Sequence, residues 1–197
     1  APHSGSSDWT LTLPSTVPSV SGQALTATTA GVSSWTTLPA GGLTDCSQWR
    51  INTNFSMGGQ NVKYYVTSGW EENDSTGYTR LGSAMTESSG VFTFPSTGFW
   101  IIRWWMTTQC SNNSAYTRAY IDVTINNSTY TSIAVGEANN ASTTYWCTPA
   151  TETLFDVTST TDCKVKVAGF TAGGNAQIQG FSDINSAYIT FSKLAAT

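Results

Sequence analysis

The chain has 197 residues, which is enough for one domain with a sizeable core and an additional segment. Charged residues make up only 10% of it, against ~25% in typical soluble proteins, so Ser, Thr, Asn and Gln must supply most of the polar surface. The net charge of −4 and the scattered positions of the eight Lys and Arg exclude a basic surface for nucleic acid, and no apolar run approaches the ~20 residues of a membrane-spanning helix.

The first predicted element is an extended arm over residues 1–45. Between Asp8 and Gly42, prolines and glycine pairs interrupt short alternating stretches, which we interpret as strand fragments. Too few large apolar residues are present for this segment to bury a core of its own. We therefore expect it to lean on a partner, on another copy or on the rest of the chain. A flexible linker is the alternative, although Trp9 and Trp35 are unusual side chains for a linker.

Residues 46–197 are predicted to form a head of short strands, because apolar residues nowhere recur at helical spacing over ten residues. The predicted strands are Trp49–Phe55, Val62–Thr67, Gly90–Phe94, Phe99–Thr107, Ala119–Ile125, Thr129–Val135, Thr144–Cys147, Thr151–Val157, Lys164–Phe170, Ala176–Gly180 and Ser186–Leu194. About ten short strands without helices indicate an all-β sandwich or jelly roll.

The segment FWIIRWWM, from Phe99 to Met106, differs from the other predicted strands because it is bulky on both faces. In a two-sheet sandwich the outer face of a strand is normally polar, as in YIDVTIN, where apolar and polar residues alternate. We therefore expect something outside the monomer to cover the second face. A symmetric oligomer is the simplest cover, and a loop or the arm is the alternative.

Four segments of the head, in this order along the chain, carry a resemblance to a known superfamily. They are GVFTFPSTGFWIIRWWM, RAYIDVTINNSTY, ETLFDVTSTTDCKVKVAGF and SDINSAYITFSKLA. The first resembles a "F-x-x-P-x-x-G-x-Y-x-F" turn leading into a central strand, with Gly98 and Phe99 at the glycine and aromatic positions. This series resembles the complement C1q and tumour necrosis factor superfamily, over roughly Cys46 to Thr197.

The resemblance implies a ten-stranded jelly-roll head that assembles as a homotrimer. Residues on the central and terminal strands would then form the trimer interface or the core. These candidates are Phe99, Ile101, Trp105, Tyr188 and Phe191. The chain departs from the superfamily at Thr161, where a glycine is usual, and it lacks the calcium-binding acidic cluster, so no metal and no cofactor is predicted.

The four cysteines, Cys46, Cys110, Cys147 and Cys163, are too widely spaced for a zinc site, and the only histidine is His3. From the residues alone, two disulfides in any of three connectivities, or buried thiols, are possible. The superfamily resemblance implies a Cys110–Cys163 bridge. It leaves Cys46 and Cys147 as a second pair, an intersubunit link or two thiols.

The arm carries a second resemblance. LTLPSTVPSVSGQALTATTAGVSSWTT, from Leu11 to Thr37, is similar to a segment of structural proteins of tailed viruses, where it often precedes a receptor-binding or decoration head. This resemblance implies a virion surface protein whose arm binds the major capsid protein or another virion protein.

No catalytic apparatus is recognised. A jelly-roll glycosidase would share the composition but needs two facing carboxylates, and Glu71 and Glu72 fall in a polar loop rather than on an aromatic strand. Nucleophile motifs are absent as well. The chain is predicted not to be an enzyme.

The predicted function is therefore a trimeric virion structural protein, either a capsid decoration or cement protein or a head fibre. The alternatives are the receptor-binding tip of a tail fibre and a secreted, extracellular lectin-like module, with a jelly-roll glycosidase as a remote one. Receptor or host-surface glycan binding would use exposed loops. The candidate loop residues are Trp70, Tyr78 and Tyr116.

Overall fold

The computed structural model describes residues 13–28, 32–37, 42–110, 116–139 and 145–196. The chain divides into two compact units, Ala1–Gly42 and Leu43–Thr197. Every regular element of the described residues is a β-strand. The described residues accordingly contain no helix of the length and apolar character needed to cross a membrane.

In the first unit, the described residues form one antiparallel hairpin, β1 (Gln23–Ala27) paired with β2 (Ser33–Thr37). Leu25 lies opposite Trp35 in this pairing. The Trp35 indole Nε1 donates a 2.7 Å hydrogen bond to the Thr16 carbonyl, which ties the segment before β1 to the hairpin. The attachment role predicted for residues 1–45 remains a prediction.

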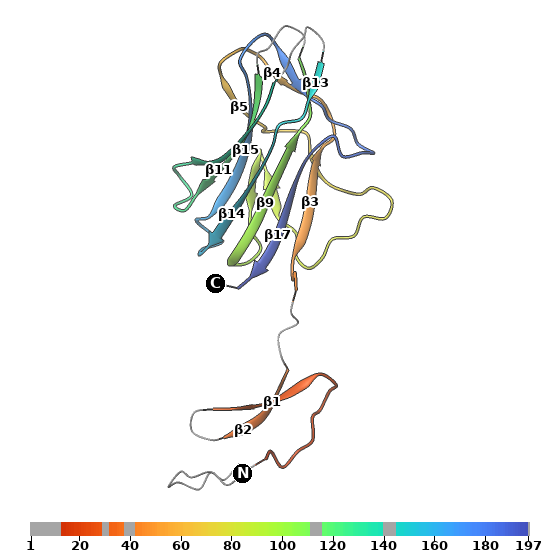
Figure 1. The fold of residues 1–197 in the computed structure, drawn as a ribbon, viewed down its shortest axis with the longest axis vertical. Helices are drawn as coiled ribbons and strands as arrows, with labels where there is room; N and C mark the ends of the chain where they lie inside the picture. The colour runs from red at the N-terminus through yellow and green to blue at the C-terminus, as the bar shows by residue number, and fades with distance from the viewer. Residues whose placement is uncertain (1–12, 29–31, 38–41, 111–115, 140–144, 197) are drawn as a thin grey trace, which may run out of the picture. The chain divides into compact units, whose positions relative to one another are not determined.

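The second unit is a sandwich of antiparallel sheets (Figure 1). One layer is a five-stranded sheet in the order β14–β9–β17–β3–β6. Its strands are β3 (Cys46–Ile51), β6 (Trp70–Glu72), β9 (Gly98–Met106), β14 (Ala150–Val157) and β17 (Ala187–Ala195). In Figure 1, β14, β9, β17 and β3 run side by side across the front of the head.

The opposite layer is a sheet in the order β12–β11–β15–β8–β7, with β5 also paired to β15. Its strands are β5 (Lys63–Tyr65), β7 (Thr86–Ser88), β8 (Val91–Thr93), β11 (Tyr116–Thr124), β12 (Thr131–Asn139) and β15 (Lys164–Thr171). A third, four-stranded sheet in the order β13–β10–β16–β4 begins where β9 ends, because only Thr107 separates β9 from β10. Its strands are β4 (Phe55–Met57), β10 (Thr108–Cys110), β13 (Tyr145–Cys147) and β16 (Ala176–Ile178).

The core lies between the two layers and is rich in aromatic rings. β9 buries every second side chain there, which is the period of a strand with one face inward. These residues are Trp100, Ile102, Trp104 and Met106. Phe92 from the opposite layer packs against Phe191 at 5.1 Å between ring centroids and edge-on against Trp70 at 5.0 Å. Such contacts add about 0.5–1.5 kcal/mol each beyond the area they bury.

The predicted all-β architecture is confirmed, but several strand boundaries differ. The strand predicted at Trp49–Phe55 overlaps the end of β3, but its extent is wrong, because the chain leaves β3 after Ile51 and enters β4 of another sheet at Phe55. The three-residue strands β6, β7 and β10 were not predicted as separate elements. Elements this short carry too few alternating positions to be recognised by periodicity.

Candidate functional site

The strongest candidate for a functional surface is the outward face of the five-stranded sheet. Because successive side chains of a strand point to opposite faces, the β9 residues between the buried ones point away from the core. We call the apolar part of this face the outward patch. It consists of Phe99, Ile101 and Trp105 of β9, Leu154 of β14 and Tyr188 of β17.

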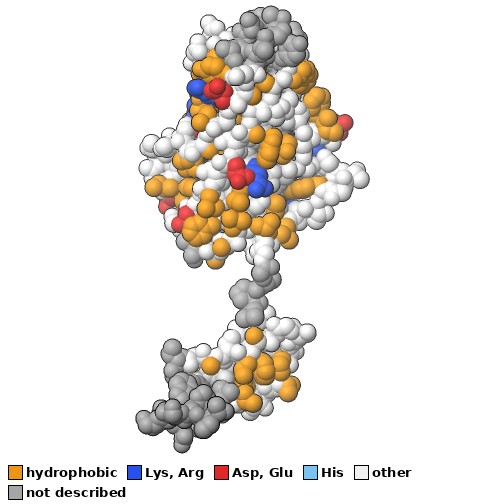
Figure 2. Space-filling view, in the orientation of Figure 1, with side chains coloured by type: hydrophobic (Ala, Val, Ile, Leu, Met, Phe, Trp, Pro, Cys, Tyr) orange, Lys and Arg blue, Asp and Glu red, His pale blue; other side chains and the backbone are white. Residues whose placement is uncertain are grey.

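The register brings the members of the outward patch together. Leu154 lies directly opposite Ile101, and Tyr188 lies directly opposite Trp105. The Trp105 and Tyr188 rings stack at 5.4 Å with an angle of 8° between their planes. Leu154 is 57% exposed, and the other four are half-buried in the monomer. Figure 2 shows apolar side chains gathered over this face of the head.

Phe191 does not belong to the outward patch. It was predicted as a trimer-interface or core residue, and it lies in the core with 0% exposure. Tyr188 and Phe191 are three residues apart on one strand, and such residues point to opposite faces. Phe191 packs instead against Phe92 and Phe94.

An ion pair lies within the outward face. Arg103 of β9 is directly opposite Glu152 of β14, and its Nε donates to the carboxylate of Glu152. This pair is half exposed in the monomer, so on its own it adds at most about 1 kcal/mol to stability. Both charges would already have a partner if the face were covered by another molecule, which avoids the penalty for burying an unpaired charge.

A second charged group fixes the edge of the same sheet. Arg50 of β3 has 0% side-chain exposure, and its Nε donates a 2.7 Å bond to Glu71. The Arg50 guanidinium also donates to Asn73, Ser75, Asp74 and the Ser182 carbonyl. One buried cation therefore holds β6, the loop after it and the loop before β17 against β3.

Of the exposed-loop candidates, Trp70 is wrong. Its side chain belongs to the core, edge-on to Phe92 and 5.6 Å from Trp104 between ring centroids, and its Nε1 donates a 2.9 Å bond to the Val66 carbonyl. Tyr78 is half-buried, and its hydroxyl accepts a 3.0 Å bond from the Gln48 backbone N–H. Burial raises the pKa of Tyr78. Both residues stabilise the fold.

Tyr116, the third candidate, is half-buried at the start of β11, where it stacks on Phe170 at 5.9 Å between ring centroids. The Arg118 guanidinium lies 4.5 Å from the centre of the Tyr116 ring and donates a 2.7 Å bond to Glu137, which raises the pKa of Arg118. Most of the loop predicted to present Tyr116 lies outside the described residues.

The implied Cys110–Cys163 disulfide is wrong. Cys163 lies just before β15, at the end where Lys164 pairs with Thr124. Cys110 hydrogen-bonds Cys147, whose sulfur lies 3.0 Å from the Thr117 hydroxyl, so Cys110 lies near the other end of β15, where Thr171 pairs with Thr117. Seven residue steps along a strand span about 23 Å, whereas a disulfide needs Cα atoms within about 7 Å. All four cysteines are thiols in this structure.

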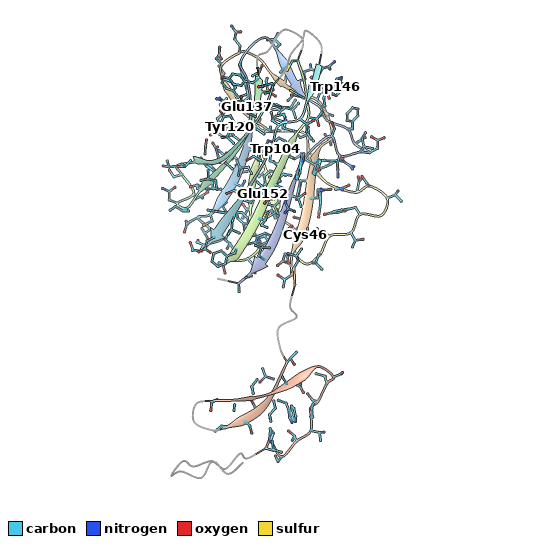
Figure 3. All side chains as sticks on the ribbon, in the orientation of Figure 1. Cys46, Trp104, Tyr120, Glu137, Trp146 and Glu152 are labelled. Carbon is cyan, nitrogen blue, oxygen red and sulfur yellow. The ribbon has the colours of Figure 1, made fainter. Side chains whose placement is uncertain are left out.

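The structure brings Cys110 and Cys147 together instead. Cys147 lies on β13 opposite Thr108, one pleat away from Cys110, and the two thiols hydrogen-bond. The bond from Cys110 lowers the pKa of Cys147 to about 6, aided by Thr108 and Thr117, whose hydroxyls lie 3.1 and 3.0 Å from the sulfur, and opposed by burial. Cys46 contacts Ser192 at 3.4 Å, and Figure 3 shows Cys46 far down the head from Trp146, the residue next to Cys147.

The outer face of the six-stranded sheet carries a hydrogen-bonded group around Asp122, which is 2% exposed. Lys63 Nζ donates to its carboxylate, and the Tyr65 hydroxyl donates to it at 2.6 Å. Burial, followed by the bond to Asp122, raises the pKa of Tyr65 to about 12. Each polar atom has a partner, so this group acts as a structural clamp between β5 and β11.

The glutamates are engaged in the structure rather than facing one another across a cleft. Glu71, Glu72, Glu137 and Glu152 each pair with an arginine, and Glu87 accepts a 2.6 Å bond from the Gly90 backbone N–H. Within the described residues, no three His, Cys, Asp or Glu side chains gather as metal ligands. These five glutamates, all within the described residues, are therefore held by partners inside the fold rather than left as a free facing pair of the kind glycoside hydrolysis uses.

Sequence reasoning missed Trp146. It lies on the three-residue strand β13 and is 53% exposed. Its direct cross-strand neighbour on β10 is Gln109, which is paired in turn with Gln177 of β16. A tryptophan in a very short strand between polar segments was the only signal in the sequence.

Comparison with solved structures identifies the fold of the head. The Eiger TNF of S. frugiperda matches with a TM-score of 0.55 at 12% identity, covering 77% of this chain and 93% of that one. Murine APRIL at pH 8.0 matches with a TM-score of 0.54 at 9% identity, covering 76% and 98%. The fold of the head is a tumour necrosis factor-like jelly roll. At these identities the likeness concerns the fold of the jelly roll alone.

No protein-family model matches the chain, and no curated protein sequence matches it. The predicted jelly roll is confirmed by the solved structures. The resemblance of the arm to proteins of tailed viruses finds no support in these comparisons and remains a prediction.

Proposed function

We propose that the chain is a non-enzymatic structural protein whose jelly-roll head assembles into a homotrimer through the outward patch. The observation that carries this proposal is the set of apolar side chains Phe99, Ile101, Trp105, Leu154 and Tyr188, which flank the Arg103–Glu152 pair on the face of the sheet that does not contact the core. Soluble monomers rarely leave such a patch on a sheet face.

The energetics favour covering this face. Apolar surface removed from water contributes roughly 25 cal/mol per Å², and fully burying a leucine contributes about 1.5–3 kcal/mol. Leu154 is 57% exposed, so covering it contributes about 1–1.7 kcal/mol in each copy. A threefold arrangement repeats this gain in every subunit and leaves the Arg103–Glu152 pair matched within each one.

For the arm, residues 1–45, we propose attachment to a larger assembly, namely the surface of a virion through the major capsid protein or another virion protein. The similarity of Leu11–Thr37 to segments of tailed-virus proteins supports this proposal. The head would then project as a decoration protein or head fibre. A receptor-binding fibre tip or a secreted binding module would use the same trimeric head without a capsid contact.

A pair of substitutions tests the trimer. Trp105→Asp places a charge in the outward patch, and Ile125→Asp places one on an apolar residue that is 70% exposed beyond the end of β11. By light scattering, we expect trimers for the wild type and for Ile125→Asp, and folded monomers for Trp105→Asp. Equal masses for all three proteins would show that the outward patch is not the contact between subunits.

A further inference from the structure

The outer surface of the four-stranded sheet holds a row of side chains that point away from the core of the head. Cross-strand pairing places Trp146, Gln109, Gln177 and Ser56 side by side, one from each strand. Asn54 adjoins this row, since its Nδ2 lies 3.4 Å from Gln177 Oε1. We propose that this amide–tryptophan row binds a neutral carbohydrate.

The exposure of Trp146 is specific to the outer side of this sheet. The other side is fully packed, and Met57, Cys110, Ala176 and Ile178 on it are at most 1% exposed. The sheet is therefore well anchored, yet it holds a 53% exposed indole in water on its outer side. Tryptophan combines a broad apolar face with a polar N–H, which suits a ligand that also has apolar and polar sides.

The amides next to Trp146 keep most of their hydrogen-bonding capacity for a ligand. Gln177 and Asn54 are exposed, and Gln109 is half-buried. Asn54 Oδ1 accepts a 3.0 Å bond from the Gly180 backbone N–H, but the side-chain bonds among these amides are long, at 3.4 Å from Asn54 to Gln177 and 3.4 Å from Gln179 to Gln109. A side-chain amide has two donors and two acceptor positions, so each can bind hydroxyl groups as donor and acceptor at once.

The charge of the row determines the class of ligand. The four strands of this sheet contain no Asp, Glu, Lys or Arg. An acidic glycan or a nucleic acid would find no cation here, whereas a neutral sugar offers C–H groups for stacking and hydroxyls for amides. Four strands at about 4.8 Å spacing give a row of about 14 Å, which suits a short oligosaccharide.

The proposal does not depend on the trimer or on a virion, because the row lies on a different sheet from the outward patch. The test uses the full chain and immobilised neutral polysaccharides, namely mannan, galactan, xylan and β-glucan, with dextran sulfate as a charged comparison. We expect the chain to bind at least one of the neutral polysaccharides and to show no specific binding to dextran sulfate.

Substitutions then locate the binding site. Trp146→Ala should weaken binding roughly tenfold or more, Trp146→Tyr should retain part of it, and Gln177→Ala should weaken it less. Ile125→Ala, at an apolar residue that is 70% exposed elsewhere, is the matched control and should bind like the wild type. Because Trp146 and Gln177 are exposed, their variants should keep the thermal midpoint of the wild type.

Three results would overturn the proposal. These are the absence of binding to all four neutral polysaccharides, binding that Trp146→Ala and Gln177→Ala leave unchanged, and a loss of oligomeric mass in Trp146→Ala. The last result would make the row a contact between subunits. A monomeric wild type that still binds through Trp146 would contradict the proposed trimer and leave the carbohydrate site intact.

Discussion

The contact between Cys110 and Cys147 predicts a specific disulfide under oxidising conditions. The two thiols hydrogen-bond across the β10–β13 pair, and the pKa of Cys147, lowered to about 6, makes its thiolate the attacking group at neutral pH. With oxidised glutathione, Cys147 forms a mixed disulfide and releases one reduced glutathione. Cys110 then displaces the second glutathione and closes the bridge, and each thiol gives up its proton.

The stabilisation follows from the loop that the bridge closes. About 38 residues lie in the loop from Cys110 to Cys147, and the loop-closure entropy for that length corresponds to about 4 kcal/mol at 25 °C. Diagonal neighbours on paired strands lie about 7–8 Å apart, at or just beyond the limit for a disulfide, so the strands must move slightly and the resulting strain should lower the observed gain to about 2–4 kcal/mol.

Urea unfolding of the oxidised protein, with and without reductant, measures this gain. Cys147→Ser should unfold at the same urea concentration in both conditions, and Cys46→Ser, which removes a thiol at the other end of the head, should behave like the wild type. Intact mass should show the loss of two hydrogens. A peptide map that joins Cys110 to Cys163, or an oxidised protein that keeps four thiols, would refute this reasoning.

Three further predictions concern the head. Arg50→Ala should lower the free energy of unfolding by about 3–5 kcal/mol, because it leaves Glu71 without its buried partner. Arg80→Ala, at the exposed pair with Glu72, should lower it by less than about 1 kcal/mol. Similar urea midpoints for the two variants would contradict the role of Arg50. Gly98→Ala should cost about 1–3 kcal/mol, because φ is 136° there and a Cβ would lie 2.3 Å from the Ala195 carbonyl oxygen; an unchanged thermal midpoint would be inconsistent with that backbone. In the reduced protein, the rate of Cys147 alkylation by iodoacetamide should rise with pH with a midpoint near 6, against about 8.5 for an ordinary thiol. A midpoint near 8.5 would show that Cys110 does not stabilise the Cys147 thiolate.

The lowered pKa of Cys147 also gives the stability of the reduced protein a pH dependence. The folded state favours the thiolate, so this contribution is fully present above the ordinary pKa of a thiol, about 8.5, and is lost as the pH falls through about 6. Cys147→Ser should remove the pH dependence that arises from this group.

The long strands of the head could be predicted from the sequence because each has one buried face. The alternation on β9 and the mixed pattern of β11 and β15 identify strands and their inward sides without any knowledge of their partners. The same rule separates Tyr188 from Phe191, since three steps along a strand reverse the side-chain direction. Applying it to the predicted interface residues would have placed Phe191 in the core.

The errors concern contacts between residues far apart in the chain. Trp70 belongs to a three-residue strand, and nothing near it in the sequence indicates that Phe92 and Trp104 surround it. The cysteine pairing came from the superfamily resemblance, and it is wrong because Cys163 precedes β15 at the end of the strand that lies away from Cys110. Trp146 was missed for the same reason, since its place at the edge of the four-stranded sheet depends on the pairing of β13 with β10.

The central claim is that the outward patch joins three copies of the chain. Sedimentation equilibrium of the native protein over a range of concentrations tests it most directly. The account predicts a species of three times the 21.0 kDa chain mass that persists on dilution. A single species at 21.0 kDa over the whole range would contradict it, and the apolar side chains around Trp105 would then need a different partner.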